Sequence, residues 1–146
     1  MFQKITKKNK KITLLGPGLS IHRAQSGFGL FTKEPILRGD FIIEYFGKKL
    51  THKEAEYHLG RYLFEINNRW TIDGSDRENK ARYINHSCRP NCEPEVKKER
   101  VFIFAKKNIP VGEELTYDYG KEYFNEFIKS KGCHCNFCDG KGKRTR

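Results

Sequence analysis

The sequence has no apolar run long enough to cross a membrane. A spanning helix needs about 20 apolar residues in succession, and no stretch of the 146 residues approaches that length. The lysine-rich start is not followed by the apolar segment of a secretory signal either. We therefore expect a soluble, intracellular protein without a membrane partner.

Acidic residues are scarce relative to basic ones. The chain has 18 Asp and Glu against 29 Lys and Arg, which gives a net charge of +11. Such an excess suits nucleic acid, an anionic membrane or an acidic protein surface without choosing among them. Much of it lies in residues 4–11 and 141–146. These basic ends are expected to be solvated and mobile, to contact DNA or a nucleosome, or to serve as a nuclear address.

Nothing in the sequence marks a second domain. The length suits one core, and 11 Phe with 7 Tyr indicate a folded chain and not a disordered basic tail. No repeat or low-complexity linker interrupts it. We divide the chain into a basic N-terminal arm (1–11), a folded domain (12–120), a helix followed by a cysteine segment (121–140) and a basic tail (141–146).

Short runs of β-branched and aromatic residues, bounded by Gly, Pro, Asn and Asp, predict a mostly β protein. The predicted strands are residues 12–15, 19–24, 41–46, 62–66, 70–72 and 101–105. A first helix is predicted over 51–59, where Thr51 and Glu54 form a capping-box pattern. A second is predicted over 121–129, with Tyr123, Phe124, Phe127 and Ile128 on one face.

The cysteines do not suggest disulfides, because five is an odd number and the chain has no export signal. Cys133, Cys135 and Cys138 place three thiols within six residues, a density typical of tetrahedral zinc. The fourth ligand remains open among the other cysteines and one nearby imidazole: Cys88, Cys92 and His134. Three free thiols on a frayed tail are the alternative.

Two further stretches carry groups that chemistry can use. SGFGLF, at residues 26–31, lets the backbone approach a ligand while Phe28 offers a ring face, although a turn is the commoner interpretation. GEELTYDYG, at residues 112–120, places Tyr117 and Tyr119 on one face of an extended segment, which packing alone could explain.

Together and in this order, SGFGLF, GDFIIEYFG, YLFEI, ARYINHSCRPNC, GEELTYDYG and a trailing CxC with a further cysteine resemble the SET-domain protein lysine methyltransferases. The resemblance covers residues 12–140 and is closest to the minimal, free-standing members. It implies a mostly β, β-clip-like fold of several small sheets and few short helices. The NHSC segment is expected to thread through a loop that includes GEELTYDY, making a knot-like core. A post-SET tail that binds zinc is expected at residues 121–140.

The resemblance also assigns site residues. Seven positions match the family's contacts with S-adenosylmethionine: Gly27, Phe28, Gly29, Tyr62, Arg82, Asn85 and His86. Tyr119 matches the catalytic tyrosine, Tyr45 a tyrosine of the lysine channel, and Tyr117 the position that tunes how many methyl groups are added. Four cysteines match the ligands of one structural zinc ion: Cys88, Cys133, Cys135 and Cys138. Cys92 is then a free thiol, and the last two zinc cysteines stand closer together than is usual in the family.

The implied activity is transfer of a methyl group from S-adenosylmethionine to a lysine side chain, mainly giving monomethyl-lysine because the Tyr117 hydroxyl occupies space beside the amine. The implied substrate is a histone or another chromatin or DNA-associated protein, in a nucleus, including that of a host cell, or in a bacterial nucleoid. Two alternatives remain. One is a zinc-stabilised, basic nucleic-acid-binding module. The other is a catalytically inactive SET domain that serves as a peptide-binding scaffold.

Overall fold

The structure is a computed structural model that describes residues 4–8, 11–58, 60–129, 132–133 and 135. It is mostly β, as predicted, and the described strands form small sheets. The two-stranded sheets pair β1 (Lys4–Lys8) with β2 (Lys11–Leu15), β3 (Leu19–Ala24) with β4 (Gly27–Thr32), and β9 (Asn85–His86) with β12 (Thr116–Tyr117). The three-stranded sheets are β10 (Cys92–Lys97), β11 (Arg100–Ala105) and β5 (Phe41–Tyr45), and β6 (Lys48–Thr51), β8 (Trp70–Asp73) and β7 (Leu63–Glu65).

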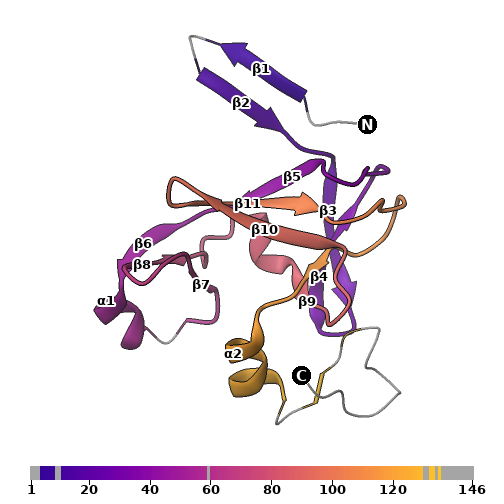
Figure 1. The fold of residues 1–146 in the computed structure, drawn as a ribbon. Helices are drawn as coiled ribbons and strands as arrows, with labels where there is room; N and C mark the ends of the chain where they lie inside the picture. The colour runs from indigo at the N-terminus through magenta and orange to yellow at the C-terminus, as the bar shows by residue number, and fades with distance from the viewer. Residues whose placement is uncertain (1–3, 9–10, 59, 130–131, 134, 136–146) are drawn as a thin grey trace.

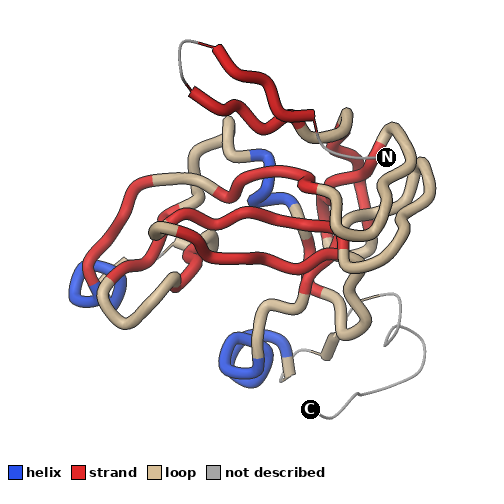
Figure 2. The backbone as a smooth tube through the Cα atoms, turned by 45° about the horizontal axis from the view of Figure 1, so that its top comes forward, coloured by secondary structure: helices blue, strands red, loops and turns tan. Residues whose placement is uncertain are grey.

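The helical segments are short. They are α1 (His52–Glu56), the 3₁₀ helix η1 (Lys80–Tyr83), α2 (Lys121–Tyr123) and the π-helical turn η2 (Phe124–Ile128) that continues α2. α1 and α2 lie at the periphery of the strands (Figure 2), whereas η1 contacts both β4 and β5. No helix in the described ranges is both long and apolar enough to span a bilayer.

The N-terminal residues form a β-hairpin where we predicted a basic arm. β2 was expected from its apolar run, but its partner β1 was not. The antiparallel register places Ile5 opposite Leu14 and Thr6 opposite Thr13, so the β-branched residues of the arm supply a second strand. Figure 1 shows this hairpin projecting from the rest of the strands.

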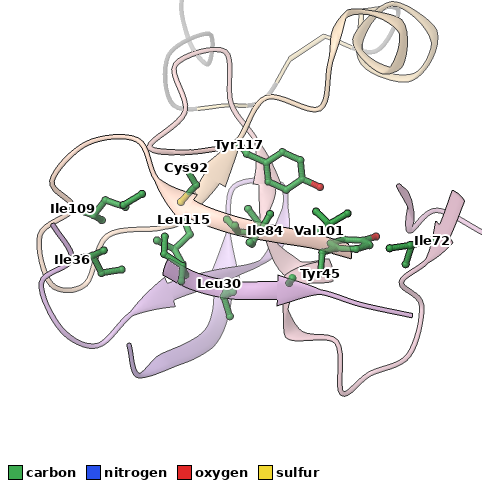
Figure 3. Close-up of a cluster of buried hydrophobic side chains, with 14 residues drawn as sticks. Leu30, Ile36, Tyr45, Ile72, Ile84, Cys92, Val101, Ile109, Leu115 and Tyr117 are labelled. Atoms are coloured by element: carbon green, nitrogen blue, oxygen red, sulfur yellow. The ribbon is translucent and has the colours of Figure 1, made fainter. Parts of the chain in front are cut away.

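The core lies on the inner face of β11. Val101, Ile103 and Ala105 are almost fully buried, while Phe102 and Phe104 between them are only partly buried, as the two-residue period of a strand requires. Each fully buried large apolar side chain contributes about 1.5–3 kcal/mol to stability. Figure 3 shows other members of the cluster, among them Leu30, Ile84 and Leu115, gathered beside this strand.

The start of α1 is confirmed and its end is not. Thr51 Oγ1 accepts the N–H of Glu54 at 3.2 Å, and Glu54 Oε2 accepts the N–H of Thr51 at 2.8 Å, which is the predicted capping box. The helix ends at Glu56 and not at residue 59. His58 instead bonds with Asp73 of β8 at 3.1 Å, so a tertiary contact takes over from the helical repeat.

The second helix is confirmed with a different geometry in its last turn. The N–H of Lys129 donates to the oxygen of Phe124 at 2.8 Å, five residues back, which defines a π-helical turn. Phe124 is 1% exposed and anchors the segment. The side chain of Phe127 lies outside the described part of the chain.

The two motif segments 85–92 and 113–117 run side by side, as the predicted knot-like core requires. β9 and β12 are parallel, with Asn85 opposite Thr116 and His86 opposite Tyr117. The buried side chain of Asn91 ties them further, because its Oδ1 accepts the N–H of Thr116 at 2.9 Å and its Nδ2 donates to the oxygen of Glu114 at 2.8 Å. These bonds fix the backbone immediately before Tyr117 and Tyr119.

Candidate active site

A cavity of about 1080 Å³ brings the motif segments together. Eight of the ten predicted catalytic and cofactor-binding residues line it: Gly27, Phe28, Tyr45, Tyr62, Arg82, Asn85, Tyr117 and Tyr119. Gly29 and His86 are not among the lining residues. The volume is at the upper end of the range for small-molecule sites, so it suffices for a cofactor together with part of a second ligand.

Three tyrosines lie close together in the cavity, and two of their hydroxyls are held by backbone oxygens. Tyr119 donates to the oxygen of Ile84 at 2.5 Å, and Tyr45 donates to the oxygen of Tyr62 at 2.9 Å. The rings of Tyr117 and Tyr119 are 5.0 Å apart between centroids. Among the described residues, no acceptor is placed against the Tyr117 hydroxyl, so this group is available to a ligand.

The environment keeps these phenols protonated. Burial raises the pKa of Tyr117 and of Tyr119 well above 10.0, the ordinary value for tyrosine, and the neighbouring tyrosines add to the effect. Burial, followed by the negative charge of Asp73, raises the pKa of Tyr45 in the same way. The three side chains therefore act as neutral hydrogen-bonding groups, and none is a phenolate base at neutral pH.

Two further aromatic residues complete the wall, and sequence reasoning did not assign them to the site. Phe64 lies between Tyr45 and Tyr117, at centroid distances of 5.4 and 6.2 Å. Tyr123 meets Tyr119 edge-on at 5.1 Å, and both Phe64 and Tyr123 line the cavity. Two spacings in the sequence could have indicated these residues. Phe64 is two residues after Tyr62, on the same face of the predicted strand, and Tyr123 is four residues after Tyr119.

Arg82 and Tyr62 form a stacked surface in the cavity. The guanidinium carbon of Arg82 is 4.3 Å from the Tyr62 ring centroid, within cation–π range. Arg82 Nη1 donates to the oxygen of Ser75, which holds the guanidinium in place. Arg82 and Tyr62, both predicted to contact the cofactor, therefore touch each other although they lie 20 residues apart in the sequence (82 − 62).

Asn85 is held by two acceptors. Its Nδ2 donates to the backbone oxygen of Phe28 at 3.0 Å and to Glu114 Oε2 at 2.8 Å. Gly29 makes this arrangement sterically feasible, because a Cβ at residue 29 would lie 2.6 Å from the same Glu114 oxygen. Gly29 therefore leaves space for the Glu114 carboxylate. Gly27 has a different role, because its positive φ of 106° is a backbone conformation that favours glycine.

His86 connects Tyr119 to the cysteines. The N–H of Tyr119 donates to His86 Nδ1 at 3.1 Å, and His86 Nε2 is 3.4 Å from the sulfur of Cys88. Because Nδ1 accepts a hydrogen bond, the proton of a neutral imidazole is on Nε2 and faces that sulfur. His86, Cys88 and Cys133 each place a possible ligand atom within 4.8 Å of the others, so this group could hold a metal ion.

The cysteine geometry fits a metal ion. The sulfurs of Cys88 and Cys133 are 3.8 Å apart, the edge expected for a tetrahedron with Zn–S bonds of about 2.3 Å. Cys135 is buried beside them, whereas Cys138 and His134 lie outside the described residues. Cys92 is 1% exposed, and its thiol donates to Asn91 Oδ1 at 3.2 Å. Of the two cysteines in the segment 85–92, Cys88 is therefore the one that contacts the C-terminal segment.

Comparison with known proteins gives relatives along most of the chain. Residues 27–120 match the SET domain. The chain is 35% identical over 144 residues to histone-lysine N-methyltransferase ash1 of Drosophila melanogaster, covering 88% of this chain and 6% of that protein. It is 38% identical over 128 residues to histone-lysine N-methyltransferase ASHH3 of Arabidopsis thaliana, covering 79% of this chain and 34% of that protein.

The fold is also similar to a chain in the crystal structure of the Chaetomium thermophilum polycomb repressive complex 2. The TM-score is 0.67 at 30% sequence identity, covering 73% of this chain and 16% of that chain. The present chain thus spans about a third or less of the length of these relatives.

Proposed function

Since the chain belongs to the SET domain family, we propose that it is a protein lysine methyltransferase that uses S-adenosylmethionine. One observation carries the proposal: a single cavity is lined both by the predicted cofactor contacts, such as Asn85 and Arg82, and by the predicted channel tyrosines, Tyr45, Tyr117 and Tyr119. The relatives' names as histone-lysine N-methyltransferases support the same activity.

The residues present fit the cofactor. S-adenosylmethionine supplies a methyl group on a positively charged sulfonium. Arg82 stacked on Tyr62 offers a flat surface for a ring system, and Asn85 offers a polar group beside Phe28. Phe28 lines the cavity and is 53% exposed, with the Arg23 guanidinium over its ring at 5.4 Å, so part of the ring is accessible to a ligand.

The aromatic wall would orient and desolvate the substrate lysine. Free lysine has a pKa of about 10.4 and its amine is almost entirely protonated at neutral pH. The enclosure of tyrosine and phenylalanine rings excludes water from the reacting atoms, and this desolvation disfavours the charged ammonium form of the lysine. Aligning the amine with the methyl group removes much of the entropic part of the barrier.

Tyr119 is assigned to orientation and electrostatics. Its proton is directed at Ile84, so the phenol oxygen presents its remaining lone pair to the cavity, where it can stabilise positive charge at the reacting centre. Its raised pKa argues against a phenolate base. The lysine proton is expected to leave through water.

Tyr117 is assigned to product specificity. Its hydroxyl is available to bond the lysine amine or to hold a water beside it, which takes the space that a methylated amine would need. We therefore propose that the main product is monomethyl-lysine.

We also propose one structural zinc ion held by four cysteines: Cys88, Cys133, Cys135 and Cys138. The 3.8 Å separation of the first two sulfurs supports this assignment. The ion would fix the C-terminal segment to the NHSC segment, and so stabilise the wall that α2 and Tyr123 add to the cavity.

The proposed substrate is a histone or another chromatin or DNA-associated protein, and the proposed location is chromatin. The relatives' names support this class. The net charge of +11 would repel a basic tail at long range. Glu56 and Glu65, which line the cavity, offer local acidic partners, and DNA bound by the basic ends would offset the remaining repulsion.

A titration with S-adenosylhomocysteine followed by a transfer assay tests the proposal. Binding with transfer of a labelled methyl group to core histones is expected. Binding without transfer to histones or to a nucleoid protein would favour the inactive scaffold. Failure to bind, together with retention of DNA, would favour the nucleic-acid-binding module.

A further inference from the structure

Glu114 contacts the site without lining it. Glu114 does not line the cavity, but its carboxylate accepts a hydrogen bond from Asn85, and Asn85 does line the cavity. The backbone around Glu114 is fixed against β4, since the N–H of Leu115 donates to the oxygen of Leu30 at 2.8 Å and residue 114 forms an antiparallel bridge with Phe31. The carboxylate therefore starts from a rigid position.

The two partners of Asn85 determine how its amide is oriented. An asparagine amide has two donor hydrogens on nitrogen and one acceptor oxygen. The backbone oxygen of Phe28 and the carboxylate of Glu114 are both acceptors, at 3.0 and 2.8 Å, so the nitrogen must face them. Asn85 then has its Oδ1 left to offer to a ligand in the cavity.

Gly29 supports the same arrangement independently. Any larger residue would place a Cβ 2.6 Å from Glu114 Oε2 and 3.1 Å from the Cβ of Ala24. A side chain at residue 29 would displace the carboxylate from Asn85. The second glycine of SGFGLF is therefore explained by the space that Glu114 occupies.

We propose that Glu114 is a positioning residue that fixes the Asn85 amide, so that Oδ1 accepts a hydrogen bond from the α-ammonium group of S-adenosylmethionine. This inference rests on the proposed function. An ammonium group is a donor only, so it requires an acceptor from the protein. The charge-assisted bond to Glu114 also polarises the amide and makes Oδ1 a stronger acceptor.

Binding of two ligands to the purified protein, measured by calorimetry, tests the inference without any turnover. S-adenosylhomocysteine carries the α-ammonium group. Its deaminated analogue keeps the adenosine, the thioether and the carboxylate but has hydrogen in place of the amino group. Glu114→Ala is expected to weaken binding of S-adenosylhomocysteine about tenfold and binding of the analogue by less than about twofold. Glu114→Gln, whose amide oxygen can still accept from Asn85, is expected to retain most of the affinity.

Glu113→Ala is the matched control. It removes the same charge from the adjacent residue, whose carboxylate contacts Asn91 at 3.3 Å and not Asn85, and it is expected to bind both ligands as the wild type does. Equal weakening of both ligands by Glu114→Ala, or no weakening of either, would overturn the inference while leaving the proposed function intact. If the wild type binds neither ligand, the proposed function itself fails and the inference fails with it.

Discussion

Tyr119 is bonded at both its backbone and its phenol to the segment 84–86. Its hydroxyl donates to the oxygen of Ile84 at 2.5 Å, and its N–H donates to Nδ1 of His86 at 3.1 Å. The two segments are more than 30 residues apart in the chain, with separations of 35 and 33 for these bonds. Tyr119 lies two residues beyond the end of β12, so the position of the candidate catalytic tyrosine depends on these tertiary contacts.

Asn91 should be essential for these contacts. Its side chain is 3% exposed and bonds to the backbone at residues 114 and 116. Asn91→Ala is expected to lower the free energy of unfolding by about 3 kcal/mol, because it leaves buried backbone groups unpaired. Asn108→Ala is the control, since Asn108 also accepts a backbone N–H, from Arg38 at 2.9 Å, but at the surface. Urea denaturation giving equal losses for both variants would contradict the role assigned to Asn91.

Tyr117→Phe should change the product and not only the rate. Without the hydroxyl, the space beside the amine can hold a methylated lysine, so dimethyl- and trimethyl-lysine are expected to accumulate. Mass spectrometry of the modified substrate measures the distribution. Tyr123→Phe removes a hydroxyl from the same cavity, but its ring contacts Tyr119, and it should leave the distribution unaltered. Identical product ratios for wild type and Tyr117→Phe would refute the assignment.

Metal content should distinguish Cys133, a proposed zinc ligand, from Cys92, which is not one. Cys133→Ser is expected to lose bound zinc and to lower the thermal midpoint, because three remaining ligands hold zinc weakly. Cys92→Ala should keep about one zinc per chain, since the Cys92 thiol donates to Asn91 Oδ1 and bonds to no other cysteine in the described part of the chain. Elemental analysis of both purified variants provides the measurement. Equal zinc content in both variants would count against a thiolate site at Cys133.

Alkaline pH should destabilise the protein through its buried phenols. The unfolded chain releases the protons of Tyr45, Tyr117 and Tyr119 near pH 10, while the folded state retains them because burial raises their pKa. The unfolded state thus binds fewer protons above that pH, and the free energy of unfolding falls as pH rises. The contribution is complete below about pH 9 and falls progressively above about pH 10, until the folded state also releases these protons.

Thermal unfolding midpoints between about pH 9 and pH 11 test this effect. Tyr117→Phe has one buried phenol fewer, so its free energy of unfolding should fall less steeply with pH. The slopes of the variant and the wild type should differ by up to about 1.4 kcal/mol per pH unit. Parallel slopes for the variant and the wild type would mean that Tyr117 ionises normally in the folded state.

The sequence predicted the strands with continuous apolar runs and missed those without them. Residues 101–105 alternate buried and partly buried side chains and were identified. β4 was interpreted as a turn because it begins GFG, and its strand character comes from pairing with β3 and from contacts with residues 113–115. The hairpin partner β1 was hidden by its lysines, which have low strand propensity.

The site was predicted as a set of positions but not as a set of contacts. The motif order identified eight residues that line the cavity, whereas Glu114 carries no local signal of its role. Asn85 meets Glu114 across 29 residues, and such pairings are determined by the crossing of segments. His86 bonds to Tyr119 and faces Cys88, two contacts that the sequence did not indicate, while its contact with the cofactor stays a prediction.

Intact-mass analysis of core histones incubated with S-adenosylmethionine and either wild type or Tyr119→Phe tests the central claim most directly. The variant lacks the phenol oxygen and its bond to Ile84 but keeps the ring contacts with His86, Tyr117 and Tyr123, so it should bind S-adenosylhomocysteine normally. We expect one added methyl group with the wild type and a rate about a hundredfold lower with the variant. An equal rate of methylation by both proteins would contradict the assignment of the active site, and no methylation by the wild type despite cofactor binding would contradict histones as the substrate.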